Sequence, residues 1–166
     1  MPPEVTDIAR DEPAQRILEL GCGAGRFSRH LARAGHRVVG IDFSPVAIEK
    51  ARARVASDAQ RPEFVVGDVT DLSNVDGPFD ASFDVGCFHC LNAHQQARYA
   101  AEVFRLIKPG GTHLIWALDD APSGIALFAP DIQKVFAPRF ALRREAFSRR
   151  RLVRSHWYWL ERQTQS

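Results

Sequence analysis

A glycine-rich turn marks the first place where this sequence has the residues to bind a ligand. Residues 21–25 read Gly-Cys-Gly-Ala-Gly and follow a short apolar run at 17–20. Such a turn between a strand and a helix lets a ligand approach the backbone, and the N–H groups at the helix N-terminus favour a carboxylate or a phosphate. Taken alone, the turn serves a nicotinamide, a flavin or another nucleotide equally well, or is a plain tight turn.

Two aspartates follow later apolar runs in the same way. Asp42 ends the run that begins at Arg37, and a carboxylate there can accept hydrogen bonds from both hydroxyls of a ribose. Asp68 ends the run that begins at Glu63, where a carboxylate can accept a hydrogen bond from an exocyclic adenine amine. The sequence therefore predicts an adenosine-like ligand at three neighbouring strand ends.

The elements that would position these residues alternate between strands and helices. The pattern predicts strands near 17–20, 37–41, 63–66, 79–85, 112–118, 140–147 and 156–161, and helices near 27–34, 45–55, 94–107 and 131–136. A turn at 108–111 is expected to separate the third helix from the fifth strand. Because right-handed crossovers place helices on both faces of a parallel sheet, the ligand is expected at the carboxyl ends of the strands.

Composition fits a single globular domain over residues 1–166. The chain is 45% hydrophobic and 25% charged, and it has no apolar run long enough to cross a bilayer. Its first residues lack the basic and apolar stretches of a signal peptide, so we expect a cytoplasmic protein with no membrane partner. The three cysteines are an odd number, which predicts reduced thiols rather than a disulfide framework.

The charge balance gives little reason to expect a nucleic-acid partner. The net charge is only +2, although the segment 139–154 holds seven arginines and one glutamate. A solvated surface is the more frequent meaning of such a basic stretch, and an anion or RNA patch is the alternative.

Four segments taken together resemble the ordered motifs of class I S-adenosylmethionine-dependent methyltransferases. They are ILELGCGAG at 17–25, VGIDFS at 39–44, VGDV at 66–69 and LIKPGG at 106–111. The Lys-Pro-Gly-Gly turn before a fifth strand is not a feature of dinucleotide-dependent dehydrogenases. The resemblance implies an α/β, Rossmann-like fold: a seven-stranded, mostly parallel sheet with an antiparallel last strand and helices on both faces.

The same resemblance implies S-adenosylmethionine as cofactor and S-adenosylhomocysteine as its product. The glycine loop would surround the methionine part, the second strand's end would hold the ribose and adenine, the third strand's end would read the base edge, and the fourth strand's end would border the methyl group. The implied cofactor-binding residues are Glu19, Gly21, Cys22, Gly23, Gly25, Asp42, Phe43, Asp68, Val69, Asp84, Val85 and Cys87.

The second half of the chain is similar to the thiopurine, thiol and halide methyltransferase branch. The similarity lies in residues 79–89, 97–100 and 157–160. That branch commonly has an arginine after the aspartate that ends the fourth strand, where this sequence has Val85. The resemblance implies a small-molecule acceptor, a thiol or other soft nucleophile, methylated mainly through proximity and in-line orientation.

The segment Cys87-Phe88-His89-Cys90 invites a metal or redox interpretation. A lone C-x-x-C lacks the second ligand pair of a structural zinc site, so we expect no metal and no disulfide here. His89 is the candidate catalytic residue, as a general base, and an inert polar contact is the alternative. Cys87 is expected to line the acceptor cavity or to pack beneath it. The expected apolar walls are Phe88, Trp116 and Phe128.

Two other functions stay open from the sequence. An RNA methyltransferase is one, although the fourth strand is followed by neither Asn/Asp-Pro-Pro-Tyr nor Pro-Cys. A non-catalytic S-adenosylmethionine-binding module is the other, because a fold does not guarantee activity. The segment 1–15 before the first strand is short and holds Pro2, Pro3 and Pro13. We therefore expect an open active site, or one covered by the partner subunit of a homodimer.

Overall fold

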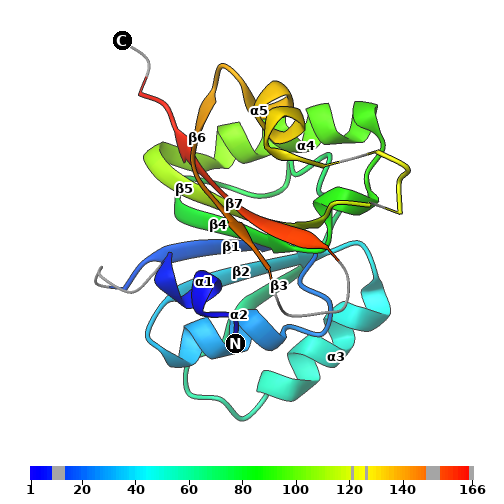
Figure 1. The fold of residues 1–166 in the computed structure, drawn as a ribbon. Helices are drawn as coiled ribbons and strands as arrows, with labels where there is room; N and C mark the ends of the chain where they lie inside the picture. The colour runs from blue at the N-terminus through cyan, green and yellow to red at the C-terminus, as the bar shows by residue number, and fades with distance from the viewer. Residues whose placement is uncertain (9–13, 121, 126, 149–153, 165–166) are drawn as a thin grey trace.

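The computed structural model describes residues 1–8, 14–120, 122–125, 127–148 and 154–164. These residues form one seven-stranded sheet, in the order β3-β2-β1-β4-β5-β7-β6, between two layers of helices (Figure 1). The strands are β1 (Arg16–Leu20), β2 (Arg37–Asp42), β3 (Glu63–Val66), β4 (Phe79–Val85), β5 (Ile107–Leu118), β6 (Phe140–Phe147) and β7 (Ser155–Arg162). The helices are α1 (Pro3–Asp7), α2 (Arg26–Arg33), α3 (Pro45–Val55), α4 (Ala93–Leu106) and α5 (Ala129–Phe136), with the 3₁₀ turn η1 (Phe88–Cys90).

The sheet is parallel from β3 through β5, and β7 runs antiparallel to both of its neighbours. This confirms the predicted Rossmann-like fold with an antiparallel last strand. The chain leaves β1 toward β2 and β3 and later returns to β4 on the other side of β1. The strand order therefore switches between β1 and β4, and a crevice opens beyond the carboxyl ends of those strands.

Each face of the sheet buries its own hydrophobic core. Leu18 and Ile115 belong to the cluster under α4 and α5, whereas Ile17 and Trp116, one position away along the same strands, belong to the cluster under α1 and α2. Figure 1 shows α4 and α5 on one face of the sheet and α1, α2 and α3 on the other. Because successive strand side chains point to opposite faces, adjacent positions contribute to different cores.

Local sequence explains where the helices begin. Ser44 caps α3, its hydroxyl accepting the Ala47 N–H at 3.3 Å, and Pro45 occupies the first helical position. Asn92 and Gln95 form a capping box at the start of α4. All four predicted helices form.

The fifth strand begins earlier than predicted. The turn expected at 108–111 is wrong, because β5 starts at Ile107 and runs through these residues. Ile107 pairs with Phe79 and Thr112 pairs with Ala81, so β5 bulges between the two pairs. Gly110 adopts φ 76°, a left-handed conformation that bends the chain without ending the strand.

The N-terminal segment contributes one short helix. Val5 of α1 is fully buried in the core with Ile17 and Leu31. Within the part of the chain that the structure describes, no helix combines the length and apolar character needed to span a membrane.

Candidate active site

A cavity of about 480 Å³ lies at the carboxyl ends of β1 to β4. Its volume falls within the range of small-molecule sites, about 300–1,000 Å³. The lining residues are Gly21, Asp42, Phe43, Gly67, Asp68, Val69, Val85, Gly86, Cys87, Cys90, Leu91 and Gln95. Seven of the predicted cofactor-binding residues are among them, so the three strand ends do converge on one space. We call it the β1–β4 cavity.

The glycine loop is folded tightly against the loop that follows β4. Gly21 has φ 70°, and a Cβ at this position would lie 2.7 Å from the Cys87 Cβ. Cys22 donates its backbone N–H to the Ile41 carbonyl at 2.8 Å. Only glycine fits at position 21, and its exposed backbone forms part of the cavity wall.

Glu19 supports the glycine loop without lining this cavity. Its side chain is 3% exposed and accepts hydrogen bonds from the Ser28 backbone N–H, at 2.8 Å, and from the Ser28 hydroxyl. Gly25, the N-cap of α2, has no side chain to offer, so Glu19 supplies the acceptor for the first turn. Burial raises the pKa of Glu19 to about 8.

Asp42 connects the end of β2 to the glycine loop. One carboxylate oxygen accepts the Gly23 N–H at 2.7 Å and the other accepts the Ser44 N–H at 2.9 Å. Each carboxylate oxygen has two lone pairs, so each retains an acceptor position toward the cavity. The arrangement can therefore hold two adjacent hydroxyl groups.

Phe43 and Asp68 form the outer part of the β1–β4 cavity. The Phe43 ring is 80% exposed at its rim, where it can pack on a flat ligand. Asp68 accepts the Thr70 N–H at 2.8 Å through one oxygen, which fixes the direction of its carboxylate. Val69, the next residue, also lines the cavity. These positions agree with a site for an adenine ring.

Asp84 holds the loop after β4 from below. It is fully buried and lies outside the cavity wall, unlike its neighbour Val85. Its carboxylate accepts the N–H groups of Cys87, at 2.7 Å, and Phe88, at 2.6 Å, and the Tyr99 hydroxyl at 3.1 Å. Burial raises the pKa of Asp84 to about 7. Its contacts are those of a residue that positions the cavity wall.

Cys22 is buried and Cys87 is partly buried, whereas Cys90 is exposed. Cys22 packs in a small core with Ile48 and Phe64 and does not line the β1–β4 cavity. Burial raises the pKa of the Cys22 and Cys87 thiols well above their usual range, which keeps them protonated. Among the described residues, no cluster of three or more histidine, cysteine or acidic side chains is arranged to hold a metal ion.

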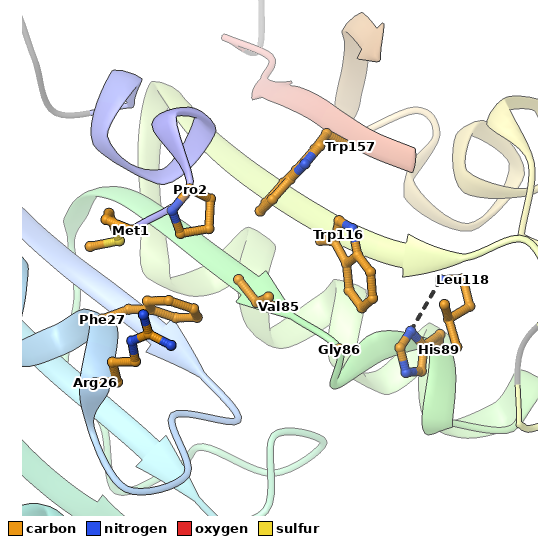
Figure 2. Close-up of a pocket in the computed structure, with 10 residues that line it drawn as sticks. All are labelled: Met1, Pro2, Arg26, Phe27, Val85, Gly86, His89, Trp116, Leu118 and Trp157. Carbon is orange, nitrogen blue, oxygen red and sulfur yellow. Dashed lines mark hydrogen bonds between the residues drawn. The ribbon is translucent and has the colours of Figure 1, made fainter. Parts of the chain in front are cut away.

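A second cavity, of about 620 Å³, adjoins the first and shares Val85 and Gly86 with it. In Figure 2, Arg26 and Phe27 lie on one side, and His89 and Trp116 on the other. We call it the α2–β5 cavity. Its lining residues are Met1, Pro2, Arg26, Phe27, Val85, Gly86, His89, Trp116, Leu118 and Trp157.

His89 faces the α2–β5 cavity, but its geometry differs from that of a general base. Its Nδ1 accepts the Leu118 backbone N–H at 3.2 Å (Figure 2). The neutral ring therefore carries its proton on Nε2 and has a donor, not a lone pair, left to offer. Burial lowers the pKa of His89, which favours this neutral form. Taking up a proton at Nδ1 would break the Leu118 hydrogen bond.

The predicted apolar walls divide between core and cavity. Trp116 lines the α2–β5 cavity as expected. Phe88 is fully buried beneath the loop, with its ring 5.2 Å from that of Tyr99. Phe128 caps α5 and lines neither cavity.

Sequence reasoning missed several lining residues. Leu91 lines the β1–β4 cavity from just before α4, and Gln95 lines it from the first turn of α4. The capping pattern of Asn92 and Gln95 was the feature that could have located them. Arg26 and Trp157 line the α2–β5 cavity although they are 131 residues apart in sequence, and no local pattern connects them.

The basic stretch at 139–154 is used for internal contacts where the structure describes it. Arg143 pairs with Glu161 at 2.9 Å, and the Arg144 guanidinium stacks 4.3 Å from the Trp159 ring centroid. Residues 149–153 lie outside the described part. The contacts agree with a solvated surface of the sheet.

Known proteins with similar sequences are methyltransferases. The chain is 30% identical over 117 residues to 2-heptyl-1-hydroxyquinolin-4(1H)-one methyltransferase of Mycobacteroides abscessus, a match over 70% of this chain and 49% of that protein. It is 37% identical over 125 residues to demethylmenaquinone methyltransferase of Clavibacter sepedonicus, over 75% and 50%. The chain thus spans about half the length of these curated relatives.

Solved structures share the fold at lower sequence identity. Magnesium protoporphyrin IX methyltransferase from Synechocystis PCC 6803, solved with bound SAM, superposes with a TM-score of 0.80 at 20% identity, over 96% of this chain and 76% of that one. A family model described as a methyltransferase domain matches residues 17–111, more than half of the chain and the part that holds the glycine loop and the ends of β2 to β4. The chain therefore belongs to this family of methyltransferase domains.

Proposed function

We propose that this chain is an S-adenosylmethionine-dependent methyltransferase that acts on a small-molecule acceptor. The observation that carries the proposal is the convergence of Gly21, Asp42 and Asp68 on the single β1–β4 cavity. These groups suit an adenosyl group. Gly21 offers a backbone loop, Asp42 has two free acceptor positions, and Asp68 and the exposed Phe43 ring line the same cavity. Two relatives are named for a hydroxyquinolinone and for demethylmenaquinone, which supports a small-molecule acceptor.

Each wall of the β1–β4 cavity would hold one part of the cofactor. Asp42 would accept the ribose hydroxyls, Phe43 would pack on the adenine, and Asp68 would accept the exocyclic amine. The glycine loop would border the methionine part. Glu19 and Asp84 would act indirectly, because each fixes the backbone of a loop that forms the wall.

The bound cofactor supplies a methyl group on a positively charged sulfur, which is already a strong electrophile. Transfer breaks the S–CH₃ bond with its electron pair left on sulfur, while a lone pair of the acceptor forms the new bond. The protein must hold the nucleophilic atom of the acceptor about 3–3.5 Å from the methyl carbon, in line with the breaking S–CH₃ bond, and must exclude water. No Lewis acid is needed for this step.

We propose a soft, anionic nucleophile as the acceptor, a thiol above all. Thiols ionise near neutral pH and lose their proton to solvent before the transfer, so proximity suffices without a base. The resemblance of residues 79–89 and 157–160 to the thiopurine, thiol and halide branch supports this choice.

We place the reaction in the cytoplasm, where thiols stay reduced. We also propose that two copies of the chain form a homodimer, and light scattering tests this oligomeric state.

The experiment supplies S-adenosylmethionine with separate pools of thiols, halides, phenols and RNA, and measures S-adenosylhomocysteine. The proposal expects product with a small-molecule pool, and less product from Asp42→Asn at equal protein concentration when the cofactor is below saturation. Turnover with RNA alone would replace the proposed acceptor by a nucleic acid. Calorimetric binding of the cofactor without turnover in any pool would assign a binding module, and no binding would refute the proposal altogether.

A further inference from the structure

The α2–β5 cavity is the place where an acceptor can meet the cofactor. Val85 and Gly86, at the end of β4, line both cavities. A molecule in one cavity would therefore lie next to a molecule in the other, with only these two residues between them. Gly86 has φ 96° and no side chain, which leaves that boundary thin. The α2–β5 cavity is lined from α2 by Arg26 and Phe27, whereas Phe43 and Asp68 line only the β1–β4 cavity.

The cavity walls select for flat apolar molecules. Three aromatic rings contribute to them, Phe27 from α2, Trp116 from β5 and Trp157 from β7. Trp116 and Trp157 are 8% and 1% exposed, so their positions are fixed by packing. Their rings project into the space between α2 and β5 (Figure 2). Rigid aromatic surfaces bind other aromatic rings favourably through stacking.

The charged and polar groups of the cavity favour a negative charge. Arg26 supplies a cation at the start of α2, and no carboxylate is among the described lining residues. His89 adds a hydrogen-bond donor, because the Leu118 N–H occupies Nδ1 and leaves the proton on Nε2. The His89 ring packs edge-on against the Trp116 ring, with 5.8 Å between the ring centroids, and this contact helps to hold its orientation.

We propose that the α2–β5 cavity binds an aromatic acceptor as its anion, an aryl thiolate or an aryloxide, with His89 donating Nε2–H to the anionic atom and Arg26 supplying the counter-charge. The inference rests on the proposed function and narrows its acceptor to one chemical class. His89 is thereby a positioning donor and not a base. Ammonium groups and other cations are disfavoured, because Arg26 repels them and no carboxylate is among the described lining residues.

The test uses 4-nitrophenol and 4-nitrothiophenol, whose anions absorb visible light, with protein saturated by S-adenosylhomocysteine. Binding is expected to shift the ionisation of each probe to lower pH, seen as extra anion absorbance at a fixed acidic pH. His89→Gln keeps an N–H donor but accepts no proton, so it retains the shift. His89→Leu and Arg26→Gln each weaken anion binding by about tenfold, equivalent to ~1.4 kcal/mol.

The control is Arg98→Gln, on the opposite face of the sheet in α4, which leaves the shift unchanged. Retention of the shift by one probe only identifies the atom, sulfur or oxygen, and supports the proposal. Loss of the shift in His89→Gln as complete as in His89→Leu would overturn the donor role. Failure of both probes to bind protein that still binds S-adenosylhomocysteine would overturn this inference alone, whereas failure of S-adenosylhomocysteine to bind would refute the proposed function.

Discussion

Gly21 and Cys87 face each other so closely that a Cβ on Gly21 would lie 2.7 Å from the Cys87 Cβ. The two residues belong to the loops that follow β1 and β4, the neighbouring parallel strands between which the strand order switches. Their contact closes one side of the β1–β4 cavity. The width of the candidate cofactor site therefore depends on the absence of a side chain at position 21.

Gly21→Ala is expected to weaken both folding and cofactor binding. The left-handed backbone, with φ 70°, costs an alanine about 1–2 kcal/mol, and the contact with Cys87 adds to this. Gly110→Ala is the matched control, because its φ of 76° imposes the same strain while its Cβ would meet nothing within 4 Å. Denaturant unfolding and calorimetry with S-adenosylhomocysteine measure the two effects. Equal losses of stability in both variants would show that the Cys87 contact is unimportant.

Asp42→Asn is expected to raise the dissociation constant of S-adenosylhomocysteine about 5- to 150-fold, or ~1–3 kcal/mol. The variant loses the charge that strengthens hydrogen bonds to two ribose hydroxyls, and its single oxygen can accept from only one of the Gly23 and Ser44 N–H groups in the present geometry. Asp76→Asn, at an exposed position remote from the cavity, provides the control and should bind as the wild type does. An unchanged constant in Asp42→Asn would remove Asp42 from the site.

Phe43→Ala is expected to weaken cofactor binding by about 1–3 kcal/mol, the usual contribution of an aromatic ring stacked on a base. Stability should change little, because the ring is 80% exposed in the structure described here. Phe147→Ala is the control, because it removes another exposed ring, 55% accessible, from β6 outside the cavity. Calorimetry that shows the same affinity for both variants would contradict the stacking role.

Glu19 makes the free energy of unfolding depend on pH. Its pKa is about 8 in the fold against 4.5 for an unperturbed glutamate, so the folded state holds a proton that the unfolded state has lost between these values. Stability therefore falls as pH rises through that interval, by at most ~1.4 kcal/mol per pH unit for one group. Glu19→Gln is expected to flatten this slope in denaturant titrations from pH 5 to pH 8.

Asp84, whose pKa is raised to about 7, contributes a slope of the same sign, so Glu19→Gln should reduce the pH dependence without abolishing it. Glu49→Gln, at an exposed position of α3, should leave the slope as it is in the wild type. If the free energy of unfolding falls with pH equally steeply in Glu19→Gln and in the wild type, Glu19 is ionised in the folded protein.

Local patterns were enough to predict most of the fold. Ser44-Pro45 fixed the start of α3, and the apolar runs located all seven strands, because capping and periodicity act over a few residues. The start of β5 was predicted wrongly. Lys108 to Gly111 has the composition of a turn, but pairing with β4 keeps it in the sheet as a bulge. A pairing partner far away in sequence overrode the local preference.

The sequence by itself determined which residues end the strands, and in a parallel sheet that is enough to bring Gly21, Asp42 and Asp68 to one edge. The tertiary structure alone decided what each polar group does there. Glu19 and Asp84 are buried and accept hydrogen bonds from Ser28 and from the Cys87 loop, contacts that the sequence did not predict. His89 became a donor because Leu118, from another strand, occupies one of its nitrogens. Hydrogen-bond partners are set by neighbours in space, and a linear pattern carries no record of them.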